Sequence, residues 1–135
     1  MKHTVTQEDG MGCGAACVAF AANIPYEQAA RLLNQDKART DGYRIKELAY
    51  GLGECGLTYR GRHVNSLGQQ TIFKEGVIVF IRRSKRYPYG HYLIRHKDLW
   101  MDPWINLPND KIVTNARSGY RKRLPGKAQW VILPV

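Results

Sequence analysis

Helical and strand-like hydrophobic patterns occupy separate halves of this chain, and their order constrains the fold more than any other feature. From Cys13 onward, small or apolar residues recur at the spacing of one helix face, and this pattern ends before Pro25. Two further helices are predicted over 25–35, where proline suits a first turn, and over 43–53. The first half of the chain is therefore expected to be helical.

The second half contains short apolar runs of strand length, at 57–62, 75–81, 90–95, 99–104 and 129–135. The continuous run EGVIVFI, 75–81, predicts a buried central strand. The runs over 90–95 and 99–104 flank a short polar turn and predict a β-hairpin. Helices followed by strands predict an α+β fold, with N-terminal helices packed on a C-terminal antiparallel sheet.

The length of the chain, 135 residues, predicts one domain over 1–135. A hydrophobic content of 44% and a charged content of 24% are ordinary for a folded globular protein. No apolar run approaches membrane-spanning length, and the first ten residues contain no apolar signal segment. The chain as given is expected to be soluble and cytoplasmic as synthesised, with delivery to another cell left open as an alternative.

The three cysteines suggest a reducing compartment. The spacing of Cys13, Cys17 and Cys55 fits neither a disulfide framework nor a usual zinc-binding pattern. We therefore expect no cofactor and no metal ion.

The formal net charge of +10 is concentrated in the second half of the chain. Residues 77–135 hold twelve Lys/Arg against three Asp/Glu, mainly in RRSKR (82–86) and RSGYRKRLPGK (117–127). Such clusters indicate either solvated loops or a surface for an anionic partner, which would be an acidic protein or nucleic acid. Because unpaired charges are costly to bury, 82–86 is expected to face solvent beside the strand that follows it.

A cysteine stands between two glycines at the start of the first predicted helix, as Gly12-Cys13-Gly14. A helix N-terminus favours a thiolate through its dipole and its unpaired backbone N–H groups. The glycines are expected to leave room for a substrate carbonyl. The backbone N–H of Cys13 and the side-chain amide of Gln7 are expected to stabilise an oxyanion. Cys17, one turn further along, is expected to pack in the core.

His91 is the best candidate for a base, because it opens the alternating strand HYLIR. If the predicted hairpin turns at 97–98, His91 and Asp102 lie on one face as diagonal neighbours, about 7–8 Å apart at the backbone. A carboxylate that orients an imidazole beside a thiol would complete a Cys-His-Asp triad.

The order of these residues resembles the papain-like cysteine peptidases of the bacteriocin-processing (double-glycine leader) family. The similarity covers residues 5 to about 107. It consists of a Gln six residues before a Cys-Gly, a middle helix bracketed by glycines, a His that opens a strand in GHYLI, and an Asp-Pro that ends the next strand in WMDPW. It implies a papain-like fold with Cys13 as nucleophile, Gln7 as oxyanion donor, His91 as base and Asp102 as orienting acid. Two features depart from the family, since no exporter segment is present and the insertion RRSKRYPYG is basic.

The activity expected from this resemblance is cysteine-dependent cleavage of an amide bond in a peptide or protein, with acidic substrates included. Two alternatives stay open. A papain-like deamidase or acyl-transfer effector, such as a toxin, would use the same triad on a glutamine side chain of a protein partner. A non-catalytic basic binding module would use these residues structurally and bind an anion such as nucleic acid, which we do not favour.

Overall fold

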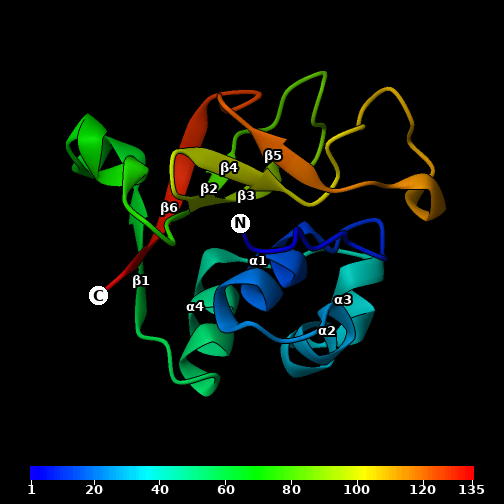
Figure 1. Ribbon diagram of the computed structural model, residues 1–135, viewed down its shortest axis with the longest axis horizontal. Coiled ribbons are helices and arrows are strands. Elements are labelled where there is room, and N and C mark those ends of the chain that lie inside the picture. The colour runs from blue at the N-terminus through cyan, green and yellow to red at the C-terminus, as the bar shows by residue number, and fades with distance from the viewer.

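The computed structural model describes residues 1–135 and consists of helices packed on one antiparallel sheet (Figure 1). The helices are α1 (Cys13–Ala22), α2 (Tyr26–Leu33), α3 (Gln35–Arg39) and α4 (Ile45–Glu54). The strands are β1 (Tyr59–His63), β2 (Ile78–Ile81), β3 (His91–His96), β4 (Leu99–Asp102), β5 (Gly119–Arg121) and β6 (Ala128–Pro134). The predicted α+β class, with helices preceding an antiparallel sheet, is confirmed.

The strand order of the sheet is β1-β6-β2-β3-β4-β5, and every neighbouring pair is antiparallel. The C-terminal strand β6 lies between β1 and β2, where Val131 pairs with Arg62 on one side and with Val79 on the other. The last strand of the chain therefore joins two strands that are consecutive in sequence, and β2 is a central strand as predicted.

Among the α-helices and strands, two were not predicted, the short helix α3 and the edge strand β5. Helix α3 has five residues and is capped by the side chain of Asn34, which accepts a hydrogen bond from the Asp36 N–H. Strand β5 has three residues and pairs only with β4. Both segments are too short to produce a hydrophobic period that could be recognised in the sequence.

Helix α1 is buried around most of its circumference, because it packs against β3, α2 and α4 (Figure 1). Its small residues let these neighbours approach closely, and Gly14–Phe20 are all buried. The helix ends at Asn23, a left-handed cap with φ of 56° whose N–H donates to the Ala19 carbonyl. None of the helices is both long and apolar enough to cross a membrane.

The two faces of the sheet contribute to different hydrophobic clusters. Ile78, Ile94 and Ile132 are aligned across β2, β3 and β6 and belong to the cluster that contains the helices. Leu93 belongs to the second cluster, on the opposite face. Because side chains alternate along β3, His91 shares the face of Leu93 at the end of the strand where the loop from β2 arrives.

Candidate active site

The β3–β4 hairpin brings His91 and Asp102 into contact. The register is the predicted one, since Ile94 pairs with Met101 and the turn consists of residues 97–98. Nε2 of His91 lies 2.7 Å from Oδ1 of Asp102, and both side chains are buried. Alternation of side chains and a two-residue turn are sufficient to produce this contact.

Asp102 is held by two further hydrogen bonds. The backbone N–H of Trp104 donates to its Oδ1 at 2.9 Å, and Nε of Arg121 donates to its Oδ2 at 2.6 Å. Burial alone would raise the pKa of Asp102, but the hydrogen bond and charge of His91, together with Arg121, hold that pKa below its usual value. Asp102 is therefore a buried carboxylate with both oxygens occupied.

Arg121 is a site residue that sequence reasoning missed. It comes from β5, and its Nη2 also donates to the Ile105 carbonyl at 3.1 Å, which fixes the guanidinium beside Asp102. In the sequence, Arg121 is only one charge of the basic stretch 117–127. No local pattern distinguishes it there, because its role depends on the pairing of β5 with β4.

Cys13 is the first residue of α1, as predicted, and its side chain is partly exposed, whereas Cys17 is fully buried. No side chain caps this helix and no acidic residue lies in its first turn, so the N-terminal N–H groups are free of competing carboxylates. Burial would lower the pKa of His91, but side-chain interactions with Asp102 and then with Cys13 raise that pKa to about 10. His91 is thus an imidazolium near neutral pH, between a carboxylate and a thiol.

The two glycines beside Cys13 have a different role from the expected one. Both are buried, and a Cβ on Gly12 would lie 2.0 Å from the Tyr26 hydroxyl oxygen. A Cβ on Gly14 would lie 3.0 Å from Leu48. The expectation that these glycines leave room for a substrate is therefore wrong. Their missing side chains instead let the start of α1 pack tightly against α2 and α4.

Gln7 lies in the wall of the same cleft as Cys13 and is almost completely buried. Its backbone N–H donates to the Pro103 carbonyl, which ties it to the end of β4. Its Nε2 donates to the carbonyls of Asp9 at 3.0 Å and Gly10 at 3.3 Å. Gln7 therefore holds the turn that leads to Cys13, and its function as an oxyanion donor stays a prediction.

Tyr87 covers one face of the His91 imidazole. Its ring is stacked on His91, with centroids 5.0 Å apart and an interplanar angle of 8°. Only 2% of Tyr87 is exposed, so this ring shields the His91–Asp102 hydrogen bond from water. From the sequence, Tyr87 is one of the aromatic residues around the predicted histidine strand that fit either a substrate groove or core packing, and the structure shows it buried.

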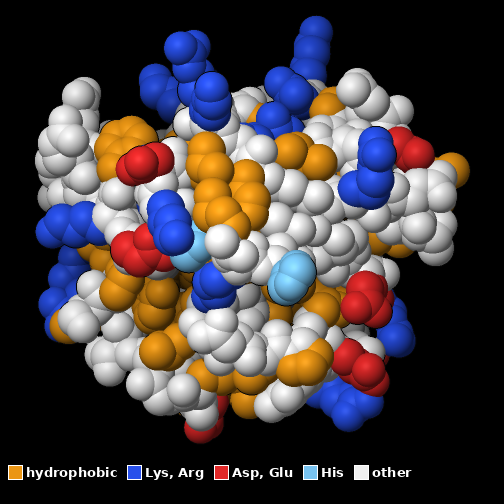
Figure 2. All heavy atoms as spheres, in the orientation of Figure 1, with side chains coloured by type: hydrophobic (Ala, Val, Ile, Leu, Met, Phe, Trp, Pro, Cys, Tyr) orange, Lys and Arg blue, Asp and Glu red, His pale blue; other side chains and the backbone are white.

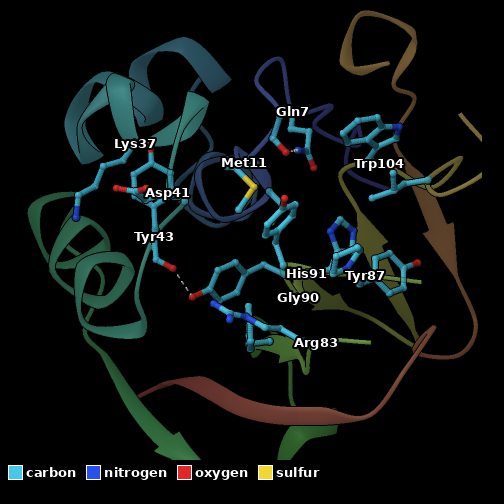
Figure 3. A pocket seen from close by; sticks show the side chains of 18 of the residues that line it. Gln7, Met11, Lys37, Asp41, Tyr43, Arg83, Tyr87, Gly90, His91 and Trp104 are labelled. Carbon is cyan, nitrogen blue, oxygen red and sulfur yellow. Dashed lines mark hydrogen bonds between the residues drawn. The ribbon is translucent and has the colours of Figure 1, made fainter. Parts of the chain in front are cut away.

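A cleft of about 1110 Å³ opens in front of these residues (Figure 3). Tyr43 and Asp41, from the segment before α4, line one side, and His91 and Tyr87 line the other, with Gln7 at one end. The hydroxyl of Tyr92 donates to the Tyr43 carbonyl at 2.7 Å and joins the two walls. The cleft therefore lies between the helices and the sheet, with Cys13 and His91 in its lining.

The structure contains no group of three or more His, Cys, Asp or Glu side chains that could hold a metal ion. Comparison of the sequence with protein-family models and with curated proteins finds no match.

Proposed function

We propose that this protein is a cysteine peptidase-like hydrolase that cleaves an amide bond through Cys13, His91 and Asp102. The observation that carries the proposal is the buried His91–Asp102 hydrogen bond of 2.7 Å, beside a partly exposed thiol at a helix N-terminus. Resemblance to the papain-like bacteriocin-processing peptidases supports the same assignment. The cleft between helices and sheet offers room for an extended peptide.

In the first proposed step, the Cys13 thiolate attacks the carbonyl carbon of the amide and forms a C–S bond. The carbonyl electrons move to oxygen, and the oxyanion is stabilised by the backbone N–H of Cys13 and by the Gln7 amide. For this, one Nε2–H of Gln7 turns from the carbonyl of Asp9 or Gly10 to the oxyanion. Nε2 of His91 is occupied by Asp102, so Nδ1 is the nitrogen left to protonate the leaving amine. The C–N bond then breaks, which leaves a thioester on Cys13.

In the second step, water attacks the thioester while His91 accepts its proton. The C–S bond breaks, the acid product leaves, and His91 returns the system to the thiolate–imidazolium pair. The orientation of His91 depends throughout on Asp102, which Arg121 and the Trp104 N–H hold in place. A backbone amide or a glutamine side-chain amide would follow the same steps.

Selective alkylation of Cys13 tests this proposal. We expect iodoacetamide at about pH 6 to modify Cys13 stoichiometrically, because only a thiol held as a thiolate reacts there. Cys55, partly exposed, and Cys17, buried, are internal controls in the same chain. Peptide mass spectrometry gives the three rates separately. His91→Gln should reduce the rate at Cys13 toward that of Cys55.

Equal rates at Cys13 and Cys55 would contradict the proposal and favour the non-catalytic basic module. If Cys13 is selectively labelled, incubation with protein substrates separates the two enzymatic outcomes. Peptidase activity produces a new chain terminus, whereas deamidation adds about 1 Da at a glutamine and leaves the chain intact.

We expect Gln7→Ala to lower turnover of a small neutral thioester reporter by roughly a hundredfold or more, the usual cost of losing one oxyanion donor. Affinity for the reporter should change little, because this interaction strengthens in the transition state. Loss of the bonds to Asp9 and Gly10 should also cost about 1–2 kcal/mol of unfolding free energy. Steady-state kinetics measures the loss of turnover, and urea unfolding measures the loss of stability. Normal turnover with weakened binding of the reporter would instead make Gln7 a substrate contact.

A further inference from the structure

The lining of the cleft is strongly biased toward cations. Its charged residues include two carboxylates, those of Asp41 and Glu47, and six cations: Lys37, Arg44, Arg83, Lys85, Arg86 and Lys111. Glu47 is already bonded to Lys37 and to a backbone N–H. Of the six cations only Lys37 is in an ion pair, and Arg44, Arg83, Lys85, Arg86 and Lys111 form none within the protein. The cleft thus has unneutralised positive charge, and three of these five cations belong to the β2–β3 loop.

The β2–β3 loop, residues 82–90, is ordered by its own hydrogen bonds. The Ser84 N–H donates to the Tyr87 carbonyl, and the Tyr87 N–H donates back to the Ser84 hydroxyl oxygen at 3.1 Å. Gly90 has φ of +75°, and a Cβ there would lie 2.1 Å from Phe80, so the chain turns tightly into β3. This arrangement buries Tyr87 and leaves the charged side chains at 82, 83, 85 and 86 exposed, as predicted.

The loop places Arg83 in the lining of the cleft that also contains His91 (Figure 3). Figure 2 shows Lys and Arg side chains gathered along the edge of the molecule from which this loop projects in Figure 1. The Arg86 guanidinium lies 5.7 Å from the Tyr87 ring, which is itself stacked on His91 at 5.0 Å. Arg86 is therefore within about 11 Å of His91, or roughly three residues of extended peptide.

We propose that the cleft selects a polypeptide with carboxylate side chains within about three residues of the cleaved bond, bound by Arg83, Lys85 and Arg86. This inference rests on the proposed function, since it names the substrate class of the same site. Spaced carboxylates fit the cleft better than nucleic acid does. A nucleic acid carries a negative charge at every phosphate. The exposed Asp41 on the opposite wall of the cleft would repel a continuous row of phosphates.

Direct binding of matched peptides tests the proposal. Binding is measured with the Cys13→Ala variant, which lacks the proposed nucleophile. The probes are two short fluorescent peptides with the same sequence, except that each Glu of the first peptide is Gln in the second. We expect the Glu peptide to bind at least about tenfold more tightly at about 50 mM salt, with most of the difference lost at about 300 mM. Arg83→Gln/Lys85→Gln/Arg86→Gln, in the same Cys13→Ala background, should remove that preference.

The matched control is Lys122→Gln/Arg123→Gln/Lys127→Gln, which removes the same charge from exposed residues outside the cleft lining. In this control, the ratio of the affinities for the Glu and Gln peptides should stay within about threefold of the ratio in the Cys13→Ala parent. In the wild-type chain, the Glu peptide should also slow iodoacetamide alkylation of Cys13, which places it in the cleft. Equal affinities for the two peptides, equal losses in the two triple variants, or binding without protection of Cys13 would each overturn the inference.

A short single-stranded oligothymidine is the competing anion. If it binds more tightly than the Glu peptide and loses affinity in the Arg83/Lys85/Arg86 variant alone, the loop is a nucleic-acid surface and the inference is overturned. Alkylation of the wild-type chain without peptide keeps the two proposals separate. A reactive Cys13 without a Glu preference contradicts only the substrate class, whereas an unreactive Cys13 contradicts the proposed function.

Discussion

Replacing Cys13 by alanine is expected to abolish thioester turnover, lowering it by roughly four orders of magnitude or more, while the protein stays folded. The variant lacks the nucleophile, so no thioester can form on the chain. The Cys13 side chain is only partly buried at the first position of α1, and alanine is a strong helix former. Reporter kinetics and urea unfolding should therefore show loss of activity with a nearly unchanged free energy of unfolding.

Cys17→Ala is the matched control for this substitution and should show the opposite pattern. Cys17 lies one turn further along the same helix and is 0% exposed. Its replacement should cost about 1 kcal/mol of unfolding free energy, through lost packing, and leave turnover intact. If Cys17→Ala removed activity and Cys13→Ala did not, Cys17 would be the nucleophile and the proposed chemistry would be wrong.

The second large effect is expected at Asp102, where Asp102→Asn should lower turnover by roughly four orders of magnitude. The amide can no longer hold His91 as an imidazolium oriented toward Cys13. The same substitution leaves the Arg121 guanidinium partly buried opposite a neutral group, which should cost about 3–5 kcal/mol of unfolding free energy. Asp98→Asn, in the exposed turn of the same hairpin, is the matched control and should change neither quantity.

The pH dependence of stability gives an independent check on Asp102. In the folded state the pKa of His91 is about 10, above its ordinary value of 6.5. The stabilisation from protonated His91 is therefore complete below pH 6.5 and is lost as the pH rises through about 10. Urea unfolding should show the wild-type free energy of unfolding falling over this window. A decline of equal size in Asp102→Asn would mean that Asp102 does not raise the pKa of His91.

Much of the candidate site could be predicted because it depends on local rules. The small residues after Cys13 predicted a helix that begins there, and α1 does. The contact of His91 with Asp102 required only side-chain alternation and a two-residue turn, and Lys97 adopts the left-handed φ of 56° in that turn. Residues within one helix or one hairpin are placed by short-range geometry, which a sequence pattern can express.

The surroundings of Cys13, His91 and Asp102 depend on contacts between distant segments. Arg121 reaches Asp102 only because β5 pairs with β4, and no hydrophobic period marks this three-residue strand. The hydrogen bond of the Gln7 N–H to Pro103 and the packing of α1 on β3 also join segments about 80 to 100 residues apart.

The sequence by itself determined the α+β class, the start of α1 at Cys13 and the register that joins His91 to Asp102, because each follows from periodicity or from a turn of fixed length. Only the tertiary structure decided that β6 lies between β1 and β2 and that Tyr87 covers His91. It also decided that Gly12 and Gly14 serve packing rather than access. These features depend on which surfaces can be buried together, a property of the whole chain that no local pattern contains.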